Sequence, residues 1–61
     1  MLALYKMTFY TARYKRDEEI NLETYQDMLN LKNALLEQIY IKDLKVFKYD
    51  KKRNEYKEIR L

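Results

Sequence analysis

Apolar and polar residues alternate with a period of two near both ends of the chain, and apolar residues recur at helical spacing in its middle. The segment 2–13 is rich in Tyr, Phe and Thr and has no helix cap, so we predict a long strand there. Its alternation assigns the side chains to two faces, with Met1, Ala3, Tyr5, Met7 and Phe9 on one and Leu4, Lys6, Thr8 and Tyr10 on the other. The charged segment 13–19 is predicted to be a connection.

A helix is predicted over residues 22–40. Asn21 is a suitable N-cap, and Glu23 lies in the first turn, where the helix dipole favours an anion. Ile20 before the cap and Tyr25 inside the helix are spaced to form a hydrophobic staple. One broad apolar face of this helix collects Leu22, Tyr25, Met28, Leu29, Leu35, Leu36, Ile39 and Tyr40, with Leu31 on its margin.

Two further strands are predicted over 44–49 and 55–61, where apolar and charged residues alternate again. Residues 50–54 join them as a hairpin, and Asn54 can adopt the left-handed conformation that a glycine usually provides. The predicted fold class is therefore α+β: a single small β-α-β-β domain over 1–61, with a three-stranded sheet and one amphipathic helix packed on one face. The strand order does not follow from the sequence, although a right-handed crossover after the first strand is the favoured connection.

Six amino-acid types are missing from the 61 residues: Gly, Pro, Ser, Cys, His and Trp. Their absence removes the ordinary zinc and haem ligands, the thiolate and serine nucleophiles and the glycine-rich phosphate loops. Thr, Tyr and Lys remain as nucleophiles, but no evident general base accompanies them. Asp17, Glu18 and Glu19 are interpreted as loop charge rather than as a metal site. We expect no enzymatic activity, no cofactor, no metal and no small-molecule substrate.

Charge is segregated along the chain. Residues 1–16 have a net charge of +4, residues 17–41 of −5 and residues 42–61 of +4, within a total of +3. If these segments map onto the predicted elements, the sheet side is basic and the helix side is acidic, and one face can then dock electrostatically. Solvation and pairing between the layers explain the same pattern without a partner.

Aromatic and basic side chains are interleaved in the predicted strands and hairpin. The candidate partner-binding residues are Lys6, Tyr10, Lys45, Phe47, Lys48, Tyr49, Lys51, Lys52, Arg53 and Tyr56. Exposed coplanar rings flanked by lysines would stack bases and hold phosphates, as in single-strand binders, and a basic hairpin can clamp phosphate oxygens. Ordinary strand composition and a solubilising turn are the simpler explanation of the same residues.

Apolar residues cover nearly half of the predicted helix and both faces of the predicted strands. A second buried surface would explain that surplus, so we expect a homodimer or an obligate protein partner. Half-exposed tyrosines are the simpler explanation. Lys32 lies within the apolar arc, where its ammonium group must reach water at the rim, pair with an acid or contact an aromatic ring. A role at a dimer interface is the alternative to a position at the rim.

No run of residues suits a signal peptide or a bilayer-spanning helix, so we expect no membrane association and a cytoplasmic location. Small size and a Lys-, Asn-, Ile- and Tyr-rich composition are typical of phage and mobile-element products, for which that location would be the host cytoplasm. The function predicted from the sequence is a small non-enzymatic binding or regulatory protein, such as an inhibitor, adaptor or assembly factor, that acts on another protein. The alternative is a nucleic-acid-binding module that uses a basic, Tyr-rich sheet face and the basic hairpin.

Overall fold

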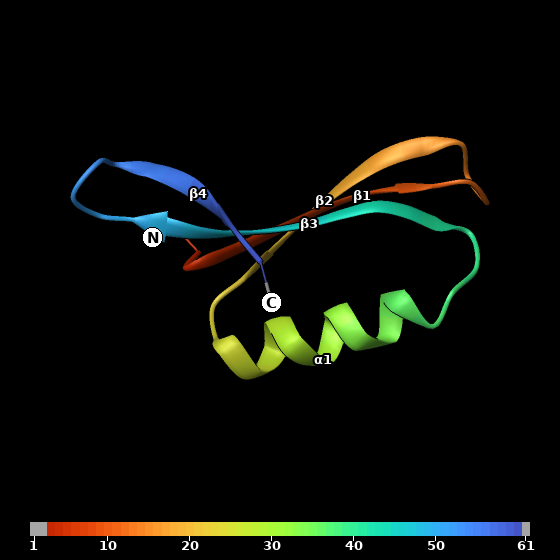
Figure 1. The fold of residues 1–61 in the computed structure, drawn as a ribbon, viewed down its shortest axis with the longest axis horizontal. Coiled ribbons are helices and arrows are strands. Elements are labelled where there is room, and N and C mark those ends of the chain that lie inside the picture. The colour runs from red at the N-terminus through yellow and green to blue at the C-terminus, as the bar shows by residue number, and fades with distance from the viewer. Residues whose placement is uncertain (1–2, 61) are drawn as a thin grey trace.

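The computed structural model describes residues 3–60, which form a four-stranded antiparallel sheet with one helix on one of its faces (Figure 1). Along the chain the elements are β1 (Tyr5–Thr11), β2 (Arg16–Leu22), α1 (Tyr25–Leu36), β3 (Ile41–Asp50) and β4 (Glu55–Ile59). In the sheet the strands follow the order β2-β1-β3-β4. The predicted α+β class with a single helix on the sheet is confirmed, whereas the predicted three-stranded β-α-β-β arrangement lacks one strand and is wrong.

The strand that the prediction lacks is β2, which occupies the end of the predicted connection and the start of the predicted helix. Its three consecutive acids disfavour a strand on composition alone. However, Ile20 and Leu22 alternate toward the helix side, where they stand opposite core residues of β1. A turn with Lys15 in the left-handed region, at φ 55°, reverses the chain into this pairing. Burial of the alternating apolar residues against β1 therefore outweighs the local preference of the acids.

β1 pairs with both β2 and β3, and all neighbouring strands of the sheet are antiparallel. The predicted right-handed crossover is wrong because such a crossover connects parallel strands. Instead, α1 links β2 to β3 on opposite sides of β1. β1 is also shorter than the strand predicted over 2–13. Met1 and Leu2 near the start of that prediction, and Leu61 at the end of the last predicted strand, lie outside the described residues.

α1 begins later than the predicted helix because its N-cap is a different residue. The side-chain hydroxyl of Thr24 accepts a hydrogen bond from the backbone N–H of Asp27 at 3.1 Å. Asn21, the predicted cap, is instead a residue of β2 opposite Lys6. Ile20 also lies in β2, so the predicted staple does not form.

β3 begins earlier than the strand predicted over 44–49. Residues 37–40, predicted to be helical, leave the helix and lead into β3. Asp43, with φ 56°, and Leu44 together stand opposite Phe9, which makes a β-bulge. The bulge interrupts the period of two, and for this reason the alternation in the sequence marks only the second part of the strand.

The β3–β4 hairpin closes as predicted, with Asn54 in the left-handed region at φ 55°. The side-chain oxygen of Asn54 accepts a hydrogen bond from the Tyr49 hydroxyl. A carboxylate oxygen of Asp50 accepts hydrogen bonds from the backbone N–H groups of Lys52, at 3.0 Å, and Arg53, at 3.4 Å. Side-chain hydrogen bonds at both ends of the turn thus define its conformation.

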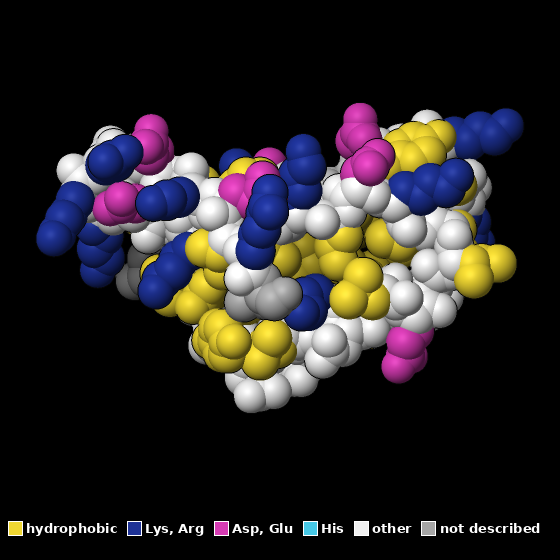
Figure 2. All heavy atoms as spheres, viewed as in Figure 1, with side chains coloured by type: hydrophobic (Ala, Val, Ile, Leu, Met, Phe, Trp, Pro, Cys, Tyr) yellow, Lys and Arg dark blue, Asp and Glu magenta, His cyan; other side chains and the backbone are white. Residues whose placement is uncertain are grey.

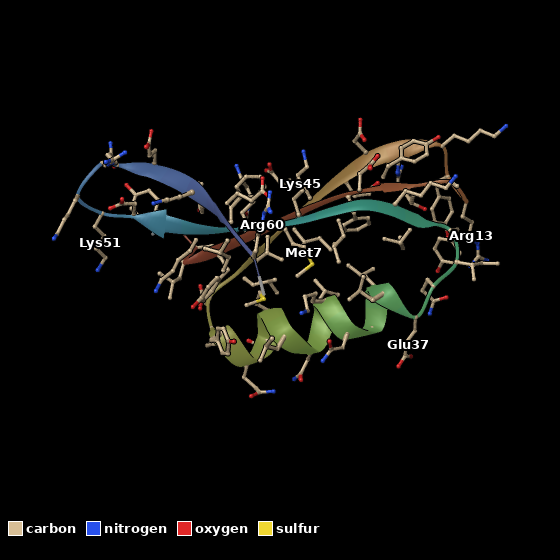
Figure 3. The ribbon with its side chains drawn as sticks, viewed as in Figure 1. Met7, Arg13, Glu37, Lys45, Lys51 and Arg60 are labelled. Atoms are coloured by element: carbon tan, nitrogen blue, oxygen red, sulfur yellow. The ribbon has the colours of Figure 1, made fainter. Side chains whose placement is uncertain are left out.

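The core lies between β1 and α1. Met7 from β1 and Met28 from α1 are both 0% exposed. The other buried apolar side chains are Tyr5, Phe9 and Val46. Figure 3 shows Met7 directed toward the helix and Lys45 directed away from it. The predicted division of the first strand into two faces is therefore confirmed for the odd-numbered residues of β1, which are buried, and the even-numbered ones, which are half-exposed.

Lys32 is half-buried on α1, next to Leu44, Val46 and Ile59 at the edge of the core. Within residues 3–60 it has no salt-bridge partner. A half-buried position at the edge of the core is the one from which the Lys32 ammonium group was predicted to reach water. Its alternative role at a dimer interface stays a prediction.

Candidate interaction surfaces

One face of the sheet has no other layer of described residues over it, because α1 packs on the opposite face (Figure 1). Strand register determines which side chains share this surface, which we call the open face, since directly paired residues point to the same side. In the order of the strands, the open face contains Asp17, Glu19 and Asn21; Lys6, Thr8 and Tyr10; Lys42, Lys45, Phe47 and Tyr49; and Tyr56 and Glu58. It therefore combines aromatic, basic and acidic side chains.

Three rings of the open face, Phe47, Tyr49 and Tyr56, form an aromatic cluster around Lys6. The Lys6 Nζ lies 5.2 Å from the ring centroid of Phe47 and 4.6 Å from that of Tyr56, within cation–π range. Tyr49 and Tyr56 meet edge to face, with centroids 5.3 Å apart and 67° between the ring planes. The Tyr56 hydroxyl donates a hydrogen bond to the Ala3 carbonyl at 2.8 Å. These contacts hold the two tyrosines at an angle and do not make a coplanar stacking platform.

Charge on the open face changes sign across the sheet. β2 contributes Asp17 and Glu19, and the Lys6 Nζ lies 3.8 Å from the Glu19 carboxylate. β3 contributes Lys42 and Lys45. The prediction of a basic sheet side and an acidic helix side is wrong, because the three consecutive acids belong to β2 and α1 itself contains one acid and one base. The polarity instead runs from an acidic edge at β2 to a basic β3–β4 hairpin.

The ten predicted partner-binding residues divide between two surfaces. Six of them share the open face: Lys6, Tyr10, Lys45, Phe47, Tyr49 and Tyr56. Lys48 stands opposite the core residue Tyr5 and therefore points to the helix side of the sheet. The remaining three lie in the exposed turn of the hairpin: Lys51, Lys52 and Arg53.

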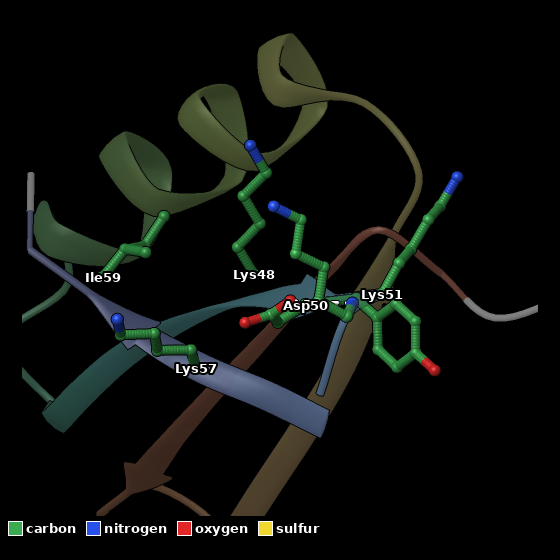
Figure 4. A pocket seen from close by; sticks show the side chains of 7 residues that line it. Lys48, Asp50, Lys51, Lys57 and Ile59 are labelled. Atoms are coloured by element: carbon green, nitrogen blue, oxygen red, sulfur yellow. Dashed lines mark hydrogen bonds between the residues drawn. The ribbon is translucent and has the colours of Figure 1, made fainter. Parts of the chain in front are cut away.

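The helix-side surface of the β3–β4 hairpin forms a pocket of about 400 Å³ (Figure 4). We call it the basic pocket, and its lining residues are Lys48, Tyr49, Asp50, Lys51, Lys52, Lys57 and Ile59. Lys48 and Lys57 are directly opposite each other in the β3–β4 ladder. Lys57 is absent from the predicted set because its place beside Lys48 depends on the exact register of the hairpin. The sequence does contain a signal for Lys57: if the hairpin turn is placed at Asn54, pairing the residues of the two strands outward from the turn puts Lys57 opposite Lys48.

Apolar side chains also reach the surface at the end of the molecule where α1 ends (Figure 2). We call Leu36, the last residue of α1, and Ile39 the end patch: Leu36 is 61% exposed and Ile39 97% exposed. Tyr14, in the turn between β1 and β2, is also 61% exposed. Beside it, a pocket of about 250 Å³ is lined in part by Tyr14 and by Thr11, which is only 3% exposed. The Thr11 Oγ1 has no hydrogen-bond partner among the described residues. Sequence reasoning missed this patch because it placed Leu36 and Ile39 on the core-facing side of a longer helix.

Residues 3–60 contain no group of three or more His, Cys, Asp or Glu side chains placed to hold a metal ion. In the same part of the chain, no helix has the length and apolar character that crossing a bilayer requires.

No protein-family model matches the chain, and neither a curated protein nor a solved structure matches it at a significant level.

Proposed function

We propose that this chain is a small non-enzymatic binding or regulatory protein whose target is another protein, and that the open face is its contact surface. The observation that supports this best is the aromatic cluster on a face that carries charges of both signs. Protein interfaces combine central aromatic anchors with a polar and charged rim. An inhibitor, an adaptor and an assembly factor each need only a surface of this kind.

The charges of the open face favour a protein over nucleic acid as its partner. Asp17 and Glu19 on β2, with Glu58 on β4, would repel phosphate groups. A protein with complementary patches can instead pair with the acidic and the basic parts of the face together, which sets its orientation.

The ring geometry supports the same choice. Flat stacking of bases on Phe47 and Tyr56 would require Lys6 to leave both rings. An interlocking protein surface, by contrast, can pack against tilted rings, because edge-to-face contacts are favourable between aromatic side chains.

The open-face proposal is tested by affinity capture from native lysate with and without nuclease treatment, with the captured proteins identified by mass spectrometry. Phe47→Ala removes one ring of the aromatic cluster, and Tyr14→Ala is the matched control that removes an exposed ring outside the open face. We expect wild type and Tyr14→Ala to retain the same protein. Phe47→Ala should weaken its binding by roughly tenfold or more, because truncation of a central aromatic anchor costs about 2 kcal/mol.

Circular dichroism of Phe47→Ala establishes that the variant is folded before its binding is compared. Capture that disappears on nuclease treatment would contradict a protein target. Equal retention by Phe47→Ala and wild type, with loss in Tyr14→Ala, would move the contact surface from the open face to the surface around Tyr14.

A further inference from the structure

The β3–β4 hairpin contains a like-charged pair that folding does not require. Lys48 and Lys57 are direct cross-strand partners, and like charges at such positions destabilise a sheet. Neither lysine forms a salt bridge with a carboxylate among residues 3–60. On the same side of the hairpin the next pair of the ladder is Asp50 opposite Glu55, yet neither lysine forms an ion pair with these acids. A like-charged pair left without ion pairs is a local conflict of the kind that is typical of functional sites in natural proteins.

Two further lysines, Lys51 and Lys52, line the same basic pocket. Figure 4 shows Lys48 and Lys51 extending from the hairpin toward the side on which α1 lies. The single acid in the lining is Asp50, and one of its carboxylate oxygens already accepts backbone N–H groups of the turn. Glu55 stands opposite Asp50 on the same side of the hairpin but does not line the pocket. The four ammonium groups of the lining outnumber both carboxylates, and this excess of positive charge suits an anion.

The hairpin is also shaped to present these lysines to a long ligand. It extends past the N-terminal end of α1, at one end of a molecule that measures 36 × 21 × 21 Å (Figure 1). The hydrogen bonds of Asp50 and of Tyr49 with Asn54 fix the turn from which the lysines project. A polymer can therefore lie across the pocket without meeting the rest of the sheet.

We propose that the basic pocket binds phosphate groups of a nucleic-acid backbone. Lysine ammonium groups act as point charges toward phosphate oxygens and need no fixed bidentate geometry. Contacts of this type position a nucleic acid without reading its bases, so binding through the pocket is tolerant of sequence. The lysines of the pocket lie on the helix side of the sheet, and Tyr49 is the residue that the pocket shares with the open face. Substitution of the lysines therefore tests this inference separately from the proposed use of the open face.

The experiment measures fluorescence anisotropy of single-stranded oligonucleotides of two unrelated sequences over a series of salt concentrations. Lys48→Gln with Lys57→Gln removes two charges from the basic pocket, and Lys42→Gln with Lys45→Gln removes two from the open face. For the pocket variant we expect about tenfold weaker binding of both sequences at low salt. Its logarithmic salt slope should flatten by about 1.4, because each contact with a single strand contributes about 0.7.

The open-face variant has the same net charge and is expected to lose much less affinity. Thermal unfolding serves as the second readout: the pocket variant should melt at the same or a higher temperature than wild type, because the like-charged pair is gone. The pocket variant should also retain the protein captured through the open face. A failure of the phosphate-binding proposal can therefore be distinguished from a failure of the open-face proposal.

Three results would overturn the proposal. One is the absence of oligonucleotide binding by wild type at low salt. Another is an equal loss of affinity in the two double variants, which would show attraction to net charge only. The third is competition by polyglutamate as effective as that by an unlabelled oligonucleotide of equal charge, which would identify an acidic protein segment as the ligand.

Discussion

Met7 and Met28 illustrate how few residues hold this fold together. They are the largest side chains without exposed surface, and both belong to the cluster that joins β1 to α1. A domain of about 60 residues buries only about 60% of the surface of its unfolded chain. The contribution of each fully buried side chain is therefore a large share of the total stability.

Met7→Ala is expected to lower the free energy of unfolding by about 2 to 5 kcal/mol, because it removes buried apolar atoms and leaves a cavity. Leu36→Ala is the matched control. Leu36 was predicted to share the core-facing side of the helix but is 61% exposed in the single chain, so its truncation should change the stability of the monomer by no more than about 0.5 kcal/mol. Both variants are compared at a concentration too low for the proposed dimer to form. Chemical denaturation followed by circular dichroism measures both variants. Similar losses of stability in the two variants would show that Leu36 is buried in solution, which would contradict a core centred on Met7 and Met28.

Among the helices and strands, the periodicity of apolar residues predicted those elements in which the apolar side chains are the buried ones. The alternation of β1 and the apolar spacing around Met28 gave the central strand and the helix. β2 could not be predicted in the same way, because Asp17 to Glu19 disfavour a strand locally and only pairing with β1 makes one. The helix start was missed because Asn21 is a good cap in isolation, although Thr24 followed by Asp27 is a good one too.

The candidate surfaces were predictable to a similar extent. Alternation alone placed Phe47 and Tyr49 on one face of a strand, but whether Tyr56 shares that face depends on the pairing of β3 with β4. The bulge at Asp43 shifts the register of β3 against β1, which a period of two cannot express. A surface built from several strands can therefore be predicted only when the strand order and register are known, whereas a single strand can be predicted from its own sequence.

The β3–β4 turn supports a prediction about backbone conformation. Asn54→Ala and Asn54→Gly both remove the side-chain acceptor of the Tyr49 hydroxyl, but only alanine is penalised at positive φ. We expect Asn54→Ala to be less stable than Asn54→Gly by about 1 kcal/mol. Thermal and chemical unfolding of the two variants measure this difference. Equal stabilities would show that the turn changes its conformation when the asparagine is lost.

For the molecule as a whole, two residues of the predicted apolar arc of the helix, Leu36 and Ile39, are exposed as the end patch, while the second buried surface stays a prediction. Ile39 and Leu36 expose most of their apolar side chains to water, and their burial against another surface would be favourable. We therefore retain the expectation of a homodimer at micromolar concentration and propose the end patch as its contact.

Leu36→Asp combined with Ile39→Asp tests this assembly. Both positions are exposed in the single chain, so we expect the unfolding free energy of the monomer to change little. The dimer, by contrast, should dissociate because the two substitutions place charges in an apolar contact. Sedimentation equilibrium of wild type and variant over a range of concentrations measures the effect. A wild-type chain that stays monomeric at high concentration would leave a different protein as the partner of the end patch.

The acidic sequence of β2 also limits how the sheet can grow. β2 is an edge strand, and an edge offers unpaired backbone N–H and C=O groups to any other strand that approaches. A second copy that added its own β2 would bring Asp17, Glu18 and Glu19 of both chains together, and their repulsion opposes that pairing. Symmetric association through a continuous β2–β2 ladder is therefore disfavoured, which leaves β4 as the other edge and side-chain contacts as the routes to a dimer. The residues that make β2 difficult to recognise as a strand thus also protect it from aggregation.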